Sequence, residues 1–200
     1  MLIIFIAILI HIYATYITHS RIKNNNNFFR KPLYDIVHSN TESLNKYSQY
    51  IDLLLLPFIL IIFKKYSDGS NKINILYHFV YCFSFIIILR SLALLVTDMP
   101  RSDITCNPHN ITWYNLLFGH CYDKIFSGHT SFTLLLLLVS YNYKIFDNYE
   151  MVFLSIAQMI YAFGIIITRN HYTIDVLLSY YIVIPLYFLI NNQNFIDIPR

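Results

Sequence analysis

The sequence predicts an all-α, polytopic membrane protein, and three observations carry this prediction. Of the 200 residues, 56% are hydrophobic and only 12% are charged, whereas a soluble domain carries roughly 25% charged residues. The mean hydropathy is +0.50. Apolar segments recur along the chain, most of them close to the length of about 18 residues that spans a bilayer. We therefore expect residues 1–200 to form one integral-membrane domain, a bundle of about six transmembrane helices.

Each apolar segment is assigned in turn to one helix. The segment near 1–18 has no basic start and no good small-residue cleavage site, so we favour a retained anchor helix over a cleaved signal. The segment near 50–63 is short and contains Pro57, which leaves a tilted span and a re-entrant piece both open. The remaining spans are expected near 73–97, 126–142, 151–168 and 172–190.

The charge pattern excludes one class of partner and leaves the orientation open. A net charge of +3 is too small to argue for nucleic acid binding. With six spans, the loops at 19–49, 98–125 and 169–171 share one face and carry eight Lys and Arg residues, against five on the other face. The positive-inside bias would place the face with eight in the cytoplasm.

The cysteines point to the opposite orientation. Cys82 lies in the third span and is interpreted as a small core residue. Cys106 and Cys121 share one loop and would be able to form a disulfide in an oxidising compartment. The same loop carries an N-glycosylation pattern at Asn110. Together these features favour a lumenal or external loop.

Two histidines open spans on the same face of the membrane. His129 opens the fourth span and His171 opens the sixth, and because two spans separate them, both must lie on one side. The helix starts at Thr130 and Tyr172 would point free backbone N–H groups toward this surface, where they could bind phosphate.

His171 and Asp175 form the most informative pair. Their spacing of four places them on one helix face, where the carboxylate can accept the imidazole N–H and fix its tautomer. An ionisable residue within a span is by default a functional candidate. A single histidine would more often be structural, but two histidines, one with Asp175 and the other after Ser127 and Gly128, favour catalysis. Three zinc ligands are a minority alternative, so we predict no metal and no cofactor.

These residues resemble the sphingomyelin synthase family of ceramide phosphotransferases, a branch of the type 2 phosphatidic acid phosphatase superfamily. The resemblance is carried, in the family order, by "PLYDIVH" (32–38), "RSLALLVTDMP" (90–100), "CYDKIFSGHT" (121–130) and "HYTIDVLLSYY" (171–181). The chain departs from the family at Tyr34, at Tyr122 and at Pro185. These departures bear more on headgroup and acceptor preference than on catalysis.

The resemblance implies a lipid phosphatase/phosphotransferase-like helical bundle of six spans. Its active site would lie on the lumenal or exoplasmic side of the Golgi, another endomembrane or the plasma membrane. By resemblance, the catalytic residues are His129, His171 and Asp175. Residues in supporting or phosphate-binding roles are Ser127, Gly128, Asp123, Lys124, Arg90 and Arg169.

The expected function follows from the same resemblance. The protein would move a phosphocholine or phosphoethanolamine headgroup from a membrane phospholipid donor to ceramide and release diacylglycerol. The alternative is a membrane lipid phosphatase or phospholipase C-like hydrolase that uses water as the acceptor. A non-catalytic lipid- or partner-binding protein ranks last, because both histidines and Asp175 are present. A homo-oligomer is compatible with the sequence.

Overall fold

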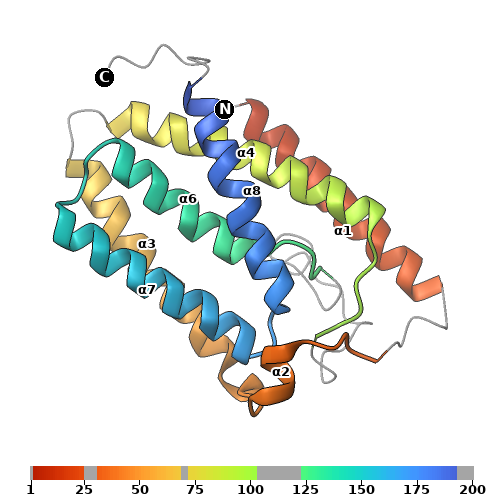
Figure 1. Ribbon diagram of the computed structural model, residues 1–200. Coiled ribbons are helices and arrows are strands. Elements are labelled where there is room, and N and C mark those ends of the chain that lie inside the picture. Colours follow the sequence, from red (N-terminus) through yellow and green to blue (C-terminus); the bar gives the residue numbers. More distant parts are fainter. Residues whose placement is uncertain (1, 25–30, 69–71, 103–122, 193–200) are drawn as a thin grey trace.

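The computed structural model describes residues 2–24, 31–68, 72–102 and 123–192, and the regular structure of these ranges is entirely helical (Figure 1). The predicted features at Cys106, Cys121 and Asn110 lie outside the described residues. The elements are α1 (Leu2–Asn24), α2 (Ile36–Asn40), a 3₁₀ turn η2 (Asn45–Tyr47), α3 (Ser48–Asp68), α4 (Lys72–Val96), α6 (Gly128–Asn142), α7 (Asn148–Ile167) and α8 (Thr173–Asn192). The predicted all-α class is confirmed.

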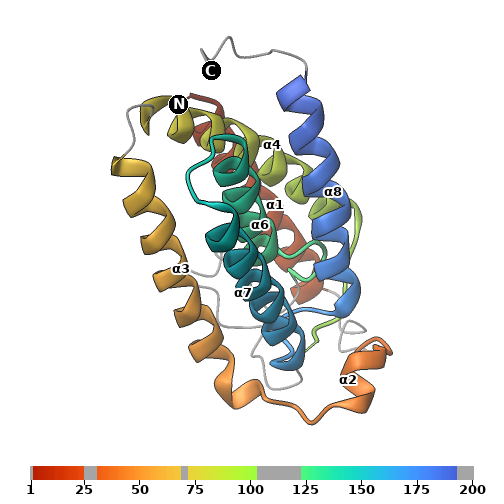
Figure 2. The same ribbon diagram turned by 60° about the vertical axis from the view of Figure 1, so that its left-hand side comes forward.

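Helix α6 forms the centre of the bundle. It packs against α3, α4, α7 and α8, whereas α1 packs mainly along α4 (Figures 1 and 2). Nine of the fifteen residues of α6 are buried, including four consecutive leucines from Leu134 to Leu137. Its hydroxyl side chains bond to the carbonyl four residues earlier, as Ser131 and Ser140 do. This local bonding lets polar side chains sit in an apolar interior without unpaired groups.

The outer helices present broad apolar faces. On α7, Val152, Phe153, Ile156, Met159, Ile160 and Phe163 are all more than half exposed. Monomers in water rarely expose a contiguous apolar patch of this kind. Four helices are long and apolar enough to cross a membrane, namely α1, α4, α7 and α8. The protein is therefore an integral membrane protein with its apolar faces in lipid.

The number of spans is the part of the fold prediction that stays open. A helix covers each of the six apolar segments, but α3 and α6 do not meet the combined length and composition of a span. Fifteen residues in α6 rise only about 22 Å, less than the roughly 30 Å hydrocarbon core of a bilayer. Helix α3 runs continuously for 21 residues with Pro57 inside it, so this segment is a helix longer than expected.

Two short elements in the loop after α1 were not expected. Helix α2 begins after Asp35, whose side chain accepts hydrogen bonds from the backbone N–H groups of Val37 and His38. Both views show α2 beside the turn between α7 and α8 (Figures 1 and 2). The same turn lies close to the start of α6, so the loop ends of several helices meet at one end of the bundle.

Candidate active site

The Ser-Gly-His-Thr segment forms the N-terminal cap of α6. Phe126, directly before it, has a φ of 67°, a left-handed conformation that turns the chain into the helix. The Ser127 hydroxyl accepts bonds from Thr130 N–H at 3.3 Å and from the Thr130 hydroxyl at 3.1 Å. These bonds satisfy a donor that the helix leaves unpaired. Ser127 is thus a capping residue that fixes the start of the helix carrying His129.

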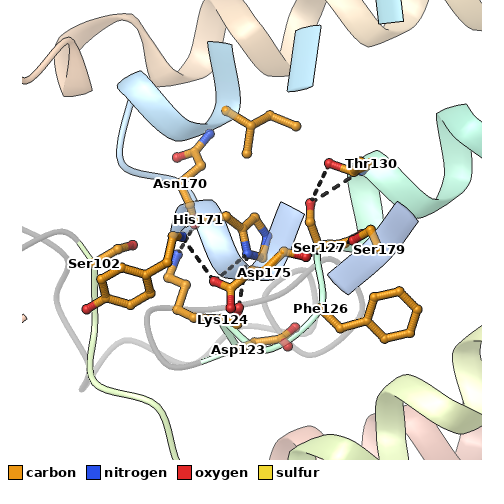
Figure 3. A network of polar contacts seen from close by, with 12 residues as sticks. Ser102, Asp123, Lys124, Phe126, Ser127, Thr130, Asn170, His171, Asp175 and Ser179 are labelled. Atoms are coloured by element: carbon orange, nitrogen blue, oxygen red, sulfur yellow. Dashed lines mark hydrogen bonds and ion pairs between the residues drawn. The ribbon is translucent and has the colours of Figure 1, made fainter. Parts of the chain in front are cut away.

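His171 lies just before α8, whereas the sequence placed it on the helix. Its Nδ1 is 3.5 Å from Asp175 Oδ2 and 3.3 Å from the Lys124 carbonyl oxygen (Figure 3). Both neighbours are acceptors, so we assign the imidazole proton to Nδ1. Nε2 then carries the lone pair. Asp175 Oδ2 also accepts the Tyr172 N–H at 3.0 Å, which holds the carboxylate in place.

Backbone and hydroxyl contacts join the two histidine segments. The Ser127 N–H donates to the Asp175 carbonyl at 3.2 Å. The Ser179 hydroxyl donates back to the Ser127 carbonyl at 3.1 Å. Figure 3 shows Ser127 and Ser179 on one side of Asp175, with His171 on the other. The start of α6 is therefore docked on the first two turns of α8, and His129 and His171 come from adjoining segments.

Burial and nearby cations determine the charge state of His171. The residue is only 5% exposed. Burial lowers its pKa well below 6.5, and the positive charges of Lys124, Arg90 and His129 lower the pKa further, while Asp123 opposes them. His171 is therefore neutral at physiological pH, as a nucleophile or general base must be.

Arg90 on α4 holds the loop that precedes α6. Its Nη2 donates to Asp123 at 2.6 Å, its Nε donates to the Phe126 carbonyl at 3.0 Å, and its Nη1 lies 3.4 Å from His11 Nε2. A Cβ on Gly128 would lie 3.2 Å from Nη1 and 3.3 Å from the guanidinium carbon. The guanidinium therefore packs directly against the first turn of α6, and a side chain at position 128 would have to displace it slightly.

The other two candidate cations have different positions. Lys124 Nζ donates to the Asn170 carbonyl at 2.6 Å, so Lys124 holds the turn before His171 while its charge stays close to the imidazole. Arg169, with a φ of 60°, donates instead to the carbonyls of His38 and Thr41. Of the cations proposed for phosphate, Arg90 and Lys124 lie near His171, and Arg169 is directed to α2.

The helix N-termini do not form the open phosphate cradle that the sequence suggested. Thr130 N–H already donates to Ser127. Tyr172 N–H donates to Asp175, and Thr173 N–H donates to Asp35 at 2.6 Å. These contacts occupy the expected donors, and two carboxylates lie at the start of α8. The positive charge available to an anion comes from side chains rather than from the dipole of this helix.

Two residues outside the predicted site support it. His11 on α1 is buried and bridges Arg90 and the Ser91 hydroxyl. Asp35 accepts hydrogen bonds from Thr173 at the start of α8. No local pattern marks His11. The spacing of Asp35 before a short helix is a capping signal that could have been found. Within the described ranges, no three His, Cys, Asp or Glu side chains gather closely enough to hold a metal ion.

The fold and site together define a helical membrane protein in which His129 and His171 come from two segments docked on one another. Residues 120–192, which contain His129, His171 and Asp175, match the family described as PAP2 superfamily C-terminal. The chain is also similar to curated ceramide phosphotransferases, so the resemblance stated from the motifs is confirmed.

Three of these relatives come from trypanosomatids. The chain is 31% identical over 121 residues to a phosphatidylinositol:ceramide inositolphosphotransferase of Trypanosoma cruzi (strain CL Brener), covering 54% of this chain and 36% of the relative. A protein of Leishmania major with the same name is 29% identical over 130 residues, 58% of this chain and 38% of the relative. A phosphatidylethanolamine:ceramide ethanolaminephosphotransferase of Trypanosoma brucei brucei is 28% identical over 130 residues, 58% of this chain and 40% of the relative. The chain thus spans less than half the length of these relatives.

Proposed function

We propose that this protein is a ceramide phosphotransferase, which moves a phosphorylated headgroup from a glycerophospholipid to ceramide and releases diacylglycerol. The observation that carries the proposal is the pairing of a neutral, Asp175-bound His171 with His129 at one end of an apolar bundle. The names of the relatives support ceramide as the acceptor. Those relatives are named for inositol and ethanolamine headgroups, whereas the motif resemblance suggested choline or ethanolamine, so the headgroup is a matter for assay.

The mechanism begins with His171. Its Nε2 lone pair attacks phosphorus, a P–N bond forms, and the P–O bond to diacylglycerol breaks while protonated His129 gives its proton to the leaving oxygen. Neutral His129 then takes the proton from the primary hydroxyl of ceramide. The resulting oxygen attacks phosphorus, the P–N bond breaks, and both histidines return to their starting states.

The surrounding charges suit this sequence. Asp175 holds the Nδ1 proton and stabilises the positive charge that develops on the phosphorylated imidazole. Arg90 and Lys124 provide positive potential where phosphate charge increases. A direct in-line attack, with His171 as general base, would use the same groups. Supporting roles are proposed for Ser127, Gly128 and Asp123, which shape the loop before His129.

The test is a transfer assay with the protein in liposomes. Fluorescent ceramide is supplied with phosphatidylcholine, phosphatidylethanolamine or phosphatidylinositol in separate reactions, and labelled sphingophospholipid identifies the headgroup. Phosphate release from phosphatidic acid, or diacylglycerol formation without ceramide, would indicate hydrolysis instead. We expect His171→Ala and His129→Ala to abolish transfer. His78→Ala, which removes another buried imidazole nearer the opposite end of α4, is the matched control. Full activity in His171→Ala would contradict the mechanism.

A further inference from the structure

The turn that carries His171 is fastened by a segment far away in the sequence. We name residues 33–48, which include α2 and η2, the α2 clasp. At the far end of this segment, Leu44 N–H donates to the Ile167 carbonyl and the Ser48 hydroxyl donates to Asn170 Oδ1. The remaining contacts join Leu33 N–H to the Tyr172 hydroxyl, Asp35 to Thr173, His38 Nε2 to the Ile166 carbonyl, and Arg169 to the His38 and Thr41 carbonyls. The clasp thus forms hydrogen bonds with most residues of the segment 166–173, which contains His171.

Asp35 makes the contacts of the clasp that reach α8. Its Oδ2 accepts the Thr173 N–H at 2.6 Å, and its Oδ1 accepts the Thr173 hydroxyl at 2.8 Å. Oδ1 also accepts the N–H groups of Val37 at 3.0 Å and His38 at 3.1 Å. One carboxylate therefore caps two helices at once, α2 in its own segment and α8 across the bundle.

The charge of Asp35 is maintained in this position. The residue is 8% exposed. Burial raises its pKa, but the hydrogen bonds from Thr173 and His38 outweigh burial and leave the pKa below its usual value. A carboxylate at the first turn of a helix is also favoured by the helix dipole. Asp35 is therefore an anion at physiological pH where it contacts the N-terminus of α8.

We propose that Asp35 is a positioning residue, which holds the His171–Asp175 pair in the geometry needed to act with His129 by capping α8 through Thr173. Thr173 stands two residues from each member of the pair, and Tyr172 N–H, the next donor, is bound by Asp175 itself. Without Asp35, the first turn of α8 loses a charged acceptor for its N–H and hydroxyl groups. Asp175 and His171 then separate beyond their 3.5 Å distance, and water reaches the imidazole. This proposal rests on the proposed function for its kinetic readout only.

The kinetic test compares Asp35→Ala with Asp147→Ala in the full chain. Asp147 caps α7, with its side chain accepting the Glu150 N–H at 2.8 Å, and it lies one helix length away from the α7–α8 turn. Asp147→Ala therefore removes an equivalent helix cap, worth about 1 kcal/mol, far from His171. We expect Asp35→Ala to lower kcat by about 10- to 100-fold with little change in KM. The acid limb of its pH profile should move upward, because a hydrated His171 is easier to protonate.

A second readout needs no activity. The rate at which diethyl pyrocarbonate modifies His171, measured by mass spectrometry, should increase several-fold in Asp35→Ala relative to wild type. The rate for His129, which is already partly exposed, should change little. This measurement does not depend on transfer activity. If the proposed function is wrong, the wild type shows no transfer, but the modification rate of His171 still tests the positioning role. If Asp35→Ala does not fold, Thr173→Val removes only the hydroxyl contact and should give a smaller change in the same direction. Equal behaviour of the Asp35 and Asp147 variants in both readouts would overturn the proposal.

Discussion

Replacing Arg90 with methionine tests how the loop before α6 is held. The substitution keeps an unbranched side chain on α4 but removes the guanidinium. Asp123, only 5% exposed, then loses its partner at 2.6 Å, and the Phe126 carbonyl loses its donor at 3.0 Å. Asp123 Oδ1 has no hydrogen-bond partner among the described residues. The substitution therefore leaves a buried carboxylate without its ion-pair partner.

The expected magnitude follows from these contacts. Charge centres about 4 Å apart attract by about 4 kcal/mol at an effective dielectric constant near 20. Removing one member of a buried pair typically destabilises a protein by about 3–5 kcal/mol. We expect Arg90→Met to lower the free energy of unfolding by about 4 kcal/mol. Asp123→Asn, which removes the charge but keeps the shape, should restore about 2 kcal/mol when it is combined with Arg90→Met.

The assay is a double-mutant cycle. Unfolding of the wild type, both single variants and the double variant is followed in mixed micelles by helical circular dichroism as denaturant is added, and transfer activity is measured in parallel. We expect a coupling free energy of at least about 2 kcal/mol between the two positions, because Asp123→Asn alone also removes one charge of the buried pair. If the two substitutions are additive to within about 0.5 kcal/mol, the ion pair does not hold the loop, and the account of Arg90 given above is wrong.

Three further predictions concern the reacting groups. Asp175→Asn should reduce kcat by about 10²-fold or more, because an amide can donate to Nδ1 and so moves the His171 proton to Nε2; folding should be unchanged by circular dichroism. The acid limb of kcat/KM should lie below pH 6.5, because folding lowers the pKa of His171. The stability linked to this imidazole should be fully present above pH 6.5 and should fall as the pH drops toward the folded pKa. Lys124→Gln removes a nearby positive charge and should move the acid limb to higher pH in a pH series. Gly128→Ala should displace the Arg90 guanidinium by a few tenths of an ångström and lower kcat by about 10-fold. The free energy of unfolding should change by no more than about 1 kcal/mol, because the higher helix propensity of alanine offsets the strain. A wild-type kcat in this variant would contradict the close packing.

The sequence predicted the helices well because an apolar segment of bilayer length is a local signal. The 14-residue segment with Pro57 was the exception. Its helix α3 extends to 21 residues because polar residues at both ends, from Ser48 and up to Asp68, continue the helical backbone beyond the apolar part. Hydropathy marks the apolar stretch and not the end of the helix. Hydropathy is also silent on α2, five residues long, which depends on the Asp35 cap.

The candidate site was predicted to the extent that its signals lie within short motifs. His171 and Asp175 are four residues apart, and Ser127 is two residues before His129, so spacing alone indicated their association. The partners of Arg90 and Asp35 are different. Asp35 meets Thr173 across 138 positions, and Arg90 meets His11 across 79. Contacts at such separations depend on helix packing, which no local pattern contains. For the same reason Arg169 was placed with the phosphate-binding residues, although its guanidinium contacts the α2 clasp.

The separation between Asp35 and Thr173 has a consequence for how the protein acquires activity during its synthesis. Helix α2 leaves the ribosome long before α8. Until α8 is made, the Asp35 carboxylate can accept the N–H groups of its own short helix but not those of Thr173. His129 follows at the start of α6, after α3 and α4, and it lies next to the His171 segment only once α8 has joined the bundle. A partly inserted chain therefore contains no complete site. The proposed transfer therefore requires that α8 has joined the bundle, and the Asp35 cap on Thr173 forms in the same step.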